Sequence, residues 1–477
     1  MSIPAFLRSA AALATVVLLF ACGSGSQQVA GIDRGGSPVA VSSSGTITGF
    51  GSIFVNGVEY DTASANIRIG GAAGTEADLR VGQVVSVAGT LDTGSTTRGK
   101  AQTVTFNAAV EGPIQAIDMA AGTLTVLGQV VRVTAATSFD DGIAPRSIAG
   151  LAVGGFVEIS GFPESSGAIL ATRIESTAAG EVEVTGVISA LDSVARRFSI
   201  NALQVDFSQA TLEGFNGAAP MDGDRVTVSG TRFSAAGTLI AAEVERQSGS
   251  IGTTSSNAEI EGLITRFNSA TDFAVSGQAV ITDAATRYEN GSAADLALDT
   301  AVEVEGIVDS QGRIVAGEIE FRSSGELRVA GPVTSVNSTT RILDILGVEV
   351  EINAATRFED HSAVNVERFS LADVGSGDYL EVRGYSAGNR LIATLLERDD
   401  AQSEVEVRGP ATNVAAPELT VLGVRVMTGG ATEFRDENDI PISASAFFTA
   451  AASGRQVEIS GELLGDVIQA EEAQIEN

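Results

Sequence analysis

The sequence is poor in cysteine, histidine, tryptophan and lysine, and each scarcity excludes a kind of chemistry. One Cys and one His exclude internal disulfides and the usual His-rich zinc or His-base sites. Lys100 is the only Lys among 29 basic residues, whereas 60 residues are acidic, so the formal net charge is −31. This charge argues against a nucleic acid partner, because binding to phosphates relies on Lys and Arg. No motif for a cofactor is present, so none is expected.

The length and composition predict several packed domains. A chain of 477 residues is longer than one ordinary domain. Its 44% of hydrophobic residues is too high for a disordered acidic chain, so hydrophobic cores are expected.

The N-terminus has the features of a targeting segment. Arg8 is followed by an apolar stretch, Ala10 to Ala21, which has the length of a signal-peptide core and is too short to span a bilayer comfortably. The stretch ends in Leu19-Phe20-Ala21-Cys22, which resembles the lipobox of bacterial lipoproteins. This resemblance implies cleavage before Cys22 and attachment of several acyl chains, palmitate among them, which together anchor a protein stably. An ordinary cleaved signal peptide with an accidental Cys is the alternative.

The predicted location follows from the residues around Cys22. Gly23 is not the Asp that often retains lipoproteins at the inner membrane, so the outer membrane of a Gram-negative bacterium is favoured. Residues 1–21 are predicted as signal peptide, and 22–44 as the lipidated Cys with a flexible Gly/Ser/Gln-rich tether.

Beyond residue 44, internal repetition dominates the sequence. The clearest landmark is an alternating segment that ends in Gly and occurs six times: Val85–Gly89, Val157–Gly161, Val226–Gly230, Val302–Gly306, Leu380–Gly384 and Val457–Gly461. We expect its apolar residues to be buried, the Glu, Ser and Thr between them to face water, and the Gly to end the strand. Other landmarks in each copy are a Gly-x-aliphatic start, a hairpin signal and, in most copies, a Thr-x-aromatic element such as Thr356-Arg357-Phe358.

These landmarks predict an all-β chain with six tandem domains. Each copy has the order strand, strand, strand, short helix, strand, strand in about 75 residues, which is the order and size of a small OB-like β-barrel. A small open sandwich is the alternative. The predicted domains are residues 45–109, 110–180, 181–257, 258–325, 326–402 and 403–477.

The first copy carries a resemblance to a known family. This copy contains the motifs Gly49-Phe50-Gly51-Ser52-Ile53 and Val55-Asn56-Gly57, followed by Asp78-Leu79-Arg80-Val81-Gly82. In these motifs it resembles a repeat domain of bacterial lipoproteins catalogued as domain of unknown function 5666. The other five copies keep the order of the landmarks but do not have these motif residues. The resemblance implies an envelope location and repetition, and it supplies no activity.

The candidates for chemistry each have a plainer interpretation. His361 lies in Phe358-Glu359-Asp360-His361-Ser362 and has no counterpart in other copies, so it is expected to be a solvated loop residue. The adjacent carboxylates of Asp140-Asp141, Glu359-Asp360 and Asp399-Asp400 are expected to point apart and stay ionised at the surface. The Thr-x-aromatic element is expected to plug the end of each barrel.

Calcium is the remaining candidate for a specific ligand. Asp436-Glu437-Asn438-Asp439 and Phe139-Asp140-Asp141-Gly142 could offer loop oxygens, yet neither has the EF-hand spacing. No metal, catalytic or cofactor residue is therefore predicted, and Cys22 is the one predicted modification site.

These observations predict a membrane-anchored structural or protein-interaction scaffold that is not an enzyme. The alternative is a repeat module that binds small cationic ligands or Ca²⁺, since the acidic charge favours a cationic protein or ligand. Short connections such as Ala109-Val110-Glu111 predict an extended, semi-rigid rod of domains, with the Ser/Thr/Gly-rich stretch from Gln247 to Asn257 as its hinge.

Overall fold

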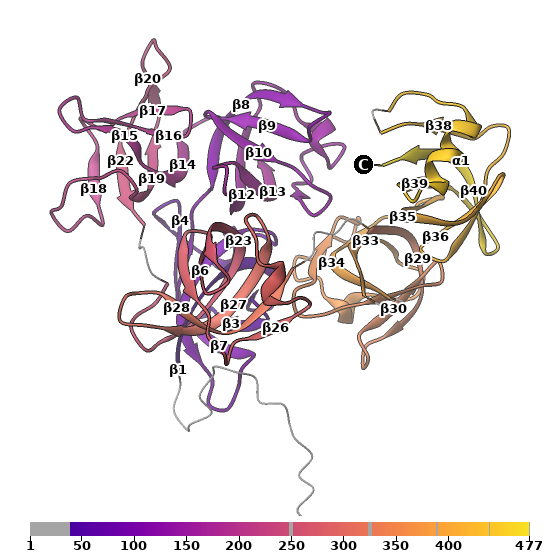
Figure 1. The fold of residues 1–477 in the computed structure, drawn as a ribbon, viewed down its shortest axis with the longest axis horizontal. Helices are drawn as coiled ribbons and strands as arrows, with labels where there is room; N and C mark the ends of the chain where they lie inside the picture. Colours follow the sequence, from indigo (N-terminus) through magenta and orange to yellow (C-terminus); the bar gives the residue numbers. More distant parts are fainter. Residues whose placement is uncertain (1–38, 248–250, 323–326, 388–389, 438, 477) are drawn as a thin grey trace, which may run out of the picture.

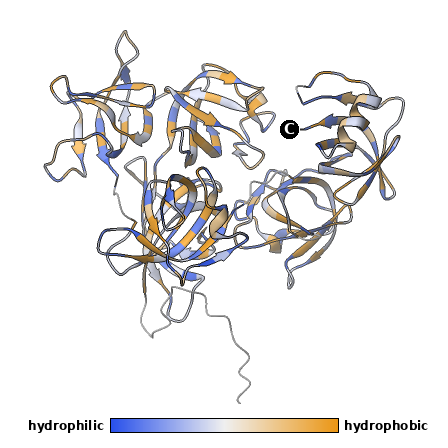
Figure 2. Cartoon of the chain, in the orientation of Figure 1, coloured by the Kyte–Doolittle hydropathy of each residue, from blue (hydrophilic) through white to orange (hydrophobic). Residues whose placement is uncertain are grey.

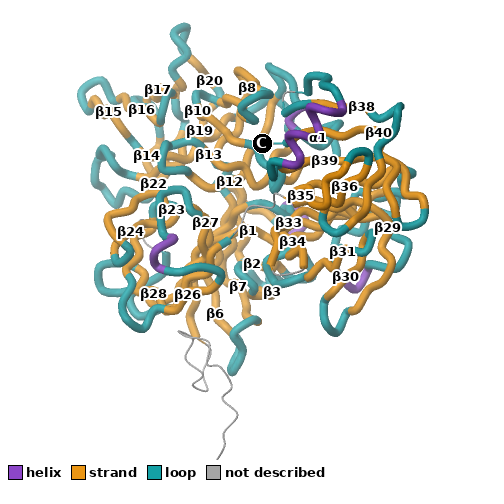
Figure 3. Tube along the Cα trace, turned by 45° about the vertical axis from the view of Figure 1, so that its right-hand side comes forward, coloured by secondary structure: helices purple, strands orange, loops and turns teal. Residues whose placement is uncertain are grey.

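The computed structural model describes residues 39–247, 251–322, 327–387, 390–437 and 439–476. These residues form 40 strands, four 3₁₀ helices and one α-helix, so the predicted all-β class is confirmed (Figures 1 and 3). Among them, no helix has the length and apolar character needed to cross a bilayer. The predicted signal peptide (1–21) and Cys22 lie outside the described residues.

The strands fall into six successive units, which we number in chain order. The first unit, residues 39–106, comprises β1 (Val39–Gly49), β2 (Ile53–Val55), β3 (Val58–Asp61), β4 (Asn66–Ile69), β5 (Ala72–Gly74), η1 (Glu76–Asp78), β6 (Val84–Leu91) and β7 (Arg98–Phe106). The second, 110–176, comprises β8 (Val110–Asp118), β9 (Thr123–Val126), β10 (Gln129–Arg132), β11 (Ser138–Phe139), η2 (Ile148–Gly150), β12 (Phe156–Pro163) and β13 (Ile169–Ser176).

The third unit, 182–246, comprises β14 (Val182–Val187), β15 (Ser189–Asp192), β16 (Arg197–Ile200), β17 (Leu203–Asp206), β18 (Thr211–Glu213), β19 (Arg225–Gly230), β20 (Arg232–Phe233), β21 (Leu239–Ile240) and β22 (Glu243–Arg246). The fourth, 257–321, comprises β23 (Asn257–Ser269), β24 (Asp272–Val275), β25 (Gln278–Ile281), β26 (Arg287–Glu289), η3 (Ala293–Asp295), β27 (Ala301–Val308) and β28 (Ile314–Phe321).

The fifth unit, 327–399, comprises β29 (Leu327–Asn337), β30 (Ile342–Ile345), β31 (Val348–Glu351), β32 (Arg357–Asp360), η4 (Leu371–Asp373), β33 (Tyr379–Ala387) and β34 (Arg390–Asp399). The sixth, 404–475, comprises β35 (Glu404–Ala415), β36 (Glu418–Val421), β37 (Val424–Met427), β38 (Glu433–Arg435), α1 (Ala444–Ala452), β39 (Gln456–Leu464) and β40 (Val467–Ile475).

Strand pairing closes on itself within a unit. In the fourth unit, β23 pairs with β24, β24 with β25, β25 with β28 in parallel, β28 with β27, and β27 again with β23. The first, second, fifth and sixth units pair in the same circular order. In the third unit the circle is divided into two sheets. Each unit whose pairing closes therefore has an inside and an outside.

The apolar residues of the clearest repeated segment fill the inside, as predicted from their spacing. Val85, Val157, Val302, Leu380 and Val457 are each at most 2% exposed, and the hydropathy colours alternate along the strands (Figure 2). The polar residues between them were predicted to face water, and this is wrong for several units. Glu303, Glu381 and Ser160 are buried as well. The outer faces of these strands lie against neighbouring units.

The repeated Gly was predicted to end its strand, but the strand continues past it. The pairing register shifts immediately before Gly161, Gly306, Gly384 and Gly461, which marks a β-bulge. A Cβ atom at Gly384 would lie 2.0 Å from the carbonyl oxygen of Ile392. The position therefore excludes a side chain because the partner strand approaches too closely.

The units do not form the predicted extended rod. The first strands of the units join them in pairs: β1 pairs with β23 in parallel, β8 with β14, and β29 with β35. β2 covers only the C-terminal half of β1, so residues 41–44 keep a free edge that β23 takes up. Residues 39–44, predicted to belong to the tether, are thus part of the folded body. This pairing sets the units side by side in twos, as Figure 1 shows, in place of an extended string.

Candidate functional site at the junction of the units

The second and fifth units meet through polar side chains far apart in sequence. Arg357 of β32 donates from Nη1 to Ser138 Oγ at 3.2 Å and to the Thr172 carbonyl at 3.0 Å. Arg146, in the loop before η2, donates from Nη2 to both carboxylate oxygens of Asp399 at 2.7 and 2.9 Å. Because these contacts join outward-facing side chains, they fix how one unit sits on the other.

The centre of this contact is a cluster of three side chains. Glu359 and His361 are two residues apart along β32 and its extension, so they share a face. Glu397 of β34 stands directly opposite Glu359 in the parallel pair. His361 Nε2 lies 3.2 Å from Glu397 Oε1 and 3.6 Å from Glu359 Oε2. The three side chains are 6%, 3% and 7% exposed for His361, Glu397 and Glu359.

The prediction that His361 is a solvated loop residue is therefore wrong. The second unit covers it, and Asp141 of that unit approaches within 2.5 Å of His361 Nδ1. The adjacent carboxylates Glu359 and Asp360 do point apart, as predicted, but neither is solvated. Asp360 is buried on the opposite face of β32, where it accepts from Arg398.

The charges of the cluster shift each other's protonation. Burial lowers the pKa of His361, but the carboxylates of Glu397 and Glu359 outweigh burial and leave this pKa above its ordinary value. Burial raises the pKa of Glu397, yet Arg383 and His361 outweigh burial and hold it below its ordinary value. Arg173 of β13 spans the contact from Glu175 at 2.6 Å to Glu359 at 3.2 Å. The cluster is thus an ion-pair network shared by two units.

A second kind of polar contact buries carboxylates without a matching cation. Burial raises the pKa of Glu183 to about 8, and nearby Glu side chains add to this effect. Burial and neighbouring carboxylates likewise raise the pKa values of Glu158 and Glu305 to about 7. Glu259 is also buried, accepts a hydrogen bond from Ser43 Oγ at 2.7 Å, and has a pKa well above its ordinary value, chiefly because of burial. In these contacts between units, the protonated form of each carboxyl group is therefore favoured.

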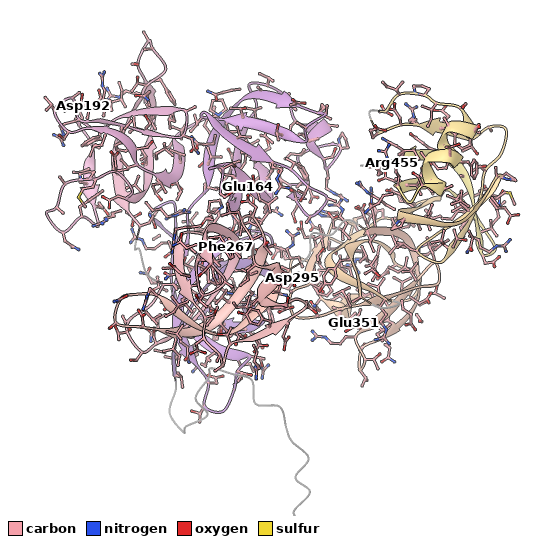
Figure 4. The ribbon with its side chains drawn as sticks, viewed as in Figure 1. Glu164, Asp192, Phe267, Asp295, Glu351 and Arg455 are labelled. Atoms are coloured by element: carbon pink, nitrogen blue, oxygen red, sulfur yellow. The ribbon has the colours of Figure 1, made fainter. Side chains whose placement is uncertain are left out.

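A cavity of about 630 Å³ lies where the first, second, fourth and fifth units meet. Its charged lining includes Arg132, Arg322, Arg357, Glu261 and Glu303. Glu164, labelled in Figure 4 and paired with Arg132, lies at the end of the second unit that faces the fourth. The wall also carries apolar side chains such as Phe162, Leu170 and Leu263, so the cavity suits a ligand with apolar surface and a few charged groups.

The predicted calcium loops do not converge into an oxygen cage among the described residues. In the first loop, Asp141 is directed to His361. In the second loop, Arg435 Nη1 donates to Asp439 Oδ1 at 2.9 Å, and Asp436 Oδ1 accepts a hydrogen bond from the backbone N–H of Ile440. Residue 438 lies outside the described residues.

The Thr-x-aromatic element has a structural role. Thr356 Oγ1 donates to the Ala393 carbonyl at 2.7 Å and accepts from the Asn353 backbone at 3.1 Å. Thr137, Thr286 and Thr432 repeat this pair of contacts in their own units. The hydroxyl therefore pins the loop before this element to the last strand.

Sequence reasoning missed the cluster because Glu397 lies far from Glu359 along the chain. The available signal was the alternation of Glu359 and His361 on one predicted strand, next to a last strand with an outward Glu. Only the strand register and the covering unit bring these groups and Asp141 together.

The closed, repeated units define the chain as an all-β tandem-repeat protein. The chain belongs to the family described as Domain of unknown function (DUF5666), whose model matches residues 111–175, 185–245, 261–320, 330–397 and 408–473. No curated protein matches it. The family is therefore the one expected from the sequence.

The predicted number of repeats, six, is wrong: the family model matches five. The unmatched segment is the first copy, whose residues carry the resemblance to the family. Between β3 and η1 this unit carries the β4–β5 hairpin, where four of the matched repeats carry the Thr-x-aromatic element. Its circular pairing resembles that of the matched units, but its middle segment is built differently.

Proposed function

We propose that this chain is a lipid-anchored scaffold of the bacterial cell envelope, held by acyl chains on Cys22 at the outer membrane. The observation that supports this proposal is the set of partly buried polar contacts between units, typified by Arg146 with Asp399, which keep units in fixed mutual positions. Fixed positions are what a scaffold needs in order to present several surfaces at once. The net charge of −31 favours a basic protein as the partner.

Each unit is proposed to be an OB-like barrel. The supporting observation is the order of pairing, in which the first strand contacts the second and the fourth, and the third runs parallel to the fifth. The short helix between the third and fourth strands, such as η3, agrees with this assignment. An experimental structure of the chain in which these strands fail to close would contradict it.

The anchor is tested by labelling cells with radioactive palmitate. The chain with Cys22 intact should take up label and sediment with the outer membrane. A Cys22→Ser variant should remain unlabelled and appear in the soluble fraction, because it lacks the thiol that carries the lipid. Equal labelling of both chains would refute the anchor, and so would recovery of the chain with Cys22 intact in the soluble fraction.

The scaffold role is tested with the soluble chain beginning at Gly23. A basic model protein and neutral polymers serve as probes, and binding is followed over a series of salt concentrations. An acidic scaffold should retain the basic protein at low salt and release it as salt screens the charges. Failure to retain it at low salt would count against a basic partner.

Binding of small cations is the second candidate function. It is favoured by Glu183, whose Oε1 is buried and makes no hydrogen bond, and by the nearby carboxylates of Glu111 and Glu158. An amine or Ca²⁺ there would offset like-charge repulsion. Thermal unfolding with polyamine, Ca²⁺ or chelator tests this: unchanged melting temperatures would exclude it.

A further inference from the structure

The cluster of Glu359, His361 and Glu397 has the spacing of a metal centre. One potential ligand atom from each residue lies within 4.8 Å of those from the other two. Tetrahedral coordination at 2.0–2.1 Å places neighbouring ligand atoms about 3.3 Å apart. The distances from His361 Nε2 to the carboxylates, 3.2 and 3.6 Å, fall on either side of this value.

Three polar atoms of these side chains, His361 Nε2, Glu359 Oε1 and Glu397 Oε2, lack hydrogen bonds although they are buried. His361 Nε2 approaches both carboxylates without acceptable hydrogen-bond geometry, and Glu359 Oε1 is also left without a partner. Buried polar atoms are normally satisfied, so an unsatisfied imidazole nitrogen aimed between two carboxylates calls for an occupant.

Asp141 supplies the outer contact that metal-bound imidazoles usually have. Its Oδ1 lies 2.5 Å from His361 Nδ1 and can accept a hydrogen bond from Nδ1–H. With Nδ1 held by Asp141, a metal ion that displaces the Nε2 proton would meet the Nε2 lone pair between the two carboxylates. The Asp141 side chain is 58% exposed, so the edge of the cluster reaches solvent and offers an entry path.

We propose that Glu359, His361 and Glu397 bind a divalent first-row metal ion such as Zn²⁺, at the contact between the second and fifth units. One imidazole nitrogen and two carboxylate oxygens suit Zn²⁺ better than Ca²⁺, which takes six to eight oxygens. Three protein ligands leave a fourth position for water.

The arginines around the cluster are compatible with this assignment. Arg173 contacts Glu359 Oε2 at 3.2 Å, and Arg383 lies 3.3 Å from Glu397 Oε2. Such contacts orient ligating carboxylates, as outer-shell donors do in metal sites. Their positive charges also weaken cation binding, so the site is expected to hold its ion less tightly than a structural zinc site does.

The experiment uses the fact that His361 is the only histidine of the chain. The protein is purified without a polyhistidine tag, labelled with ¹⁵N-histidine and stripped with chelator. One pair of imidazole resonances then reports on the site during a Zn²⁺ titration. Zn²⁺ should shift Nε2 to the position of a metal-bound nitrogen while Nδ1 keeps its proton, and chelator should reverse the change. An unmoved Nε2 at saturating Zn²⁺ would overturn the proposal.

Variants provide a second measurement by competition with a coloured zinc indicator. Glu359→Gln should no longer bind Zn²⁺. The control Glu349→Gln, at an exposed position of the same unit, should still bind one Zn²⁺ ion per chain. Asp141→Asn should weaken affinity about 10–100-fold through its outer-shell role. If circular dichroism shows all variants folded and Glu359→Gln still binds as the unmodified chain does, the assignment is wrong.

Discussion

Removal of the Arg173 guanidinium group should loosen the contacts among three units. Arg173 is 7% exposed and belongs to the second unit. It pairs with Glu359 of the fifth unit and donates to the Val81 carbonyl of the first at 3.2 Å. An Arg173→Met variant keeps most of the apolar stem and deletes the charge. It leaves a buried carboxylate without this partner, which costs about 3–5 kcal/mol.

The assay is urea unfolding with chelator present, compared with Arg98→Met. Arg98 also pairs with a Glu, at 3.0 Å, but its side chain is 68% exposed, so its loss should cost no more than about 1 kcal/mol. Adding Glu359→Gln to Arg173→Met should recover part of the lost stability, because the unpaired charge is then gone.

Two results would refute this reasoning. One is an Arg173→Met midpoint no lower than that of Arg98→Met. The other is a double variant whose loss equals the sum of the two single losses, because that would mean Arg173 and Glu359 do not interact in the folded protein.

Three further predictions follow from single side chains. Gly384→Ala should lower the melting temperature by an amount equivalent to about 1–3 kcal/mol or more, because its Cβ would overlap a carbonyl of the partner strand, whereas Gly430→Ala, which has open space, should melt as the unmodified chain does. Stability should fall between about pH 5 and pH 8.5, because the pKa of Glu183 is raised to about 8 in the folded state; its contribution is full below the ordinary value near 4.5 and is lost as pH rises through 8. Glu183→Gln should flatten this pH profile in chemical unfolding, and an unchanged slope would contradict the assignment. Thr356→Val removes a buried hydroxyl with two hydrogen bonds and should cost about 1–3 kcal/mol in urea unfolding, whereas Thr340→Val, at an exposed turn, should leave the midpoint unchanged.

The local pattern was enough to predict the inside of each unit. Alternation at Val302 and Val304 predicted which side chains are buried, and the order of landmarks predicted strands on both sides of a short helix such as η3. These features depend on neighbours within one unit, so a period-two pattern carries them. The Gly of the same landmark was misinterpreted, because a bulge and a strand end both call for Gly.

The candidate site could not be predicted in the same way. The sequence places Glu359, His361 and Asp360 on one short segment, yet says nothing of which surface covers them. The sequence pattern of a polar residue on an outer strand face is the same whether that face meets water or another unit. Asp141 and Arg173 reach the cluster only because the second unit packs there.

The amino-acid sequence by itself determined the all-β class, the family and the cores of the units, because burying an apolar face is a local requirement with a fixed spacing. Only the tertiary structure decided that the units pair through their first strands and bury their charged faces against each other. A free strand edge can accept any partner strand, and the charges along it acquire their neighbours, and hence their protonation, only after that partner has been chosen.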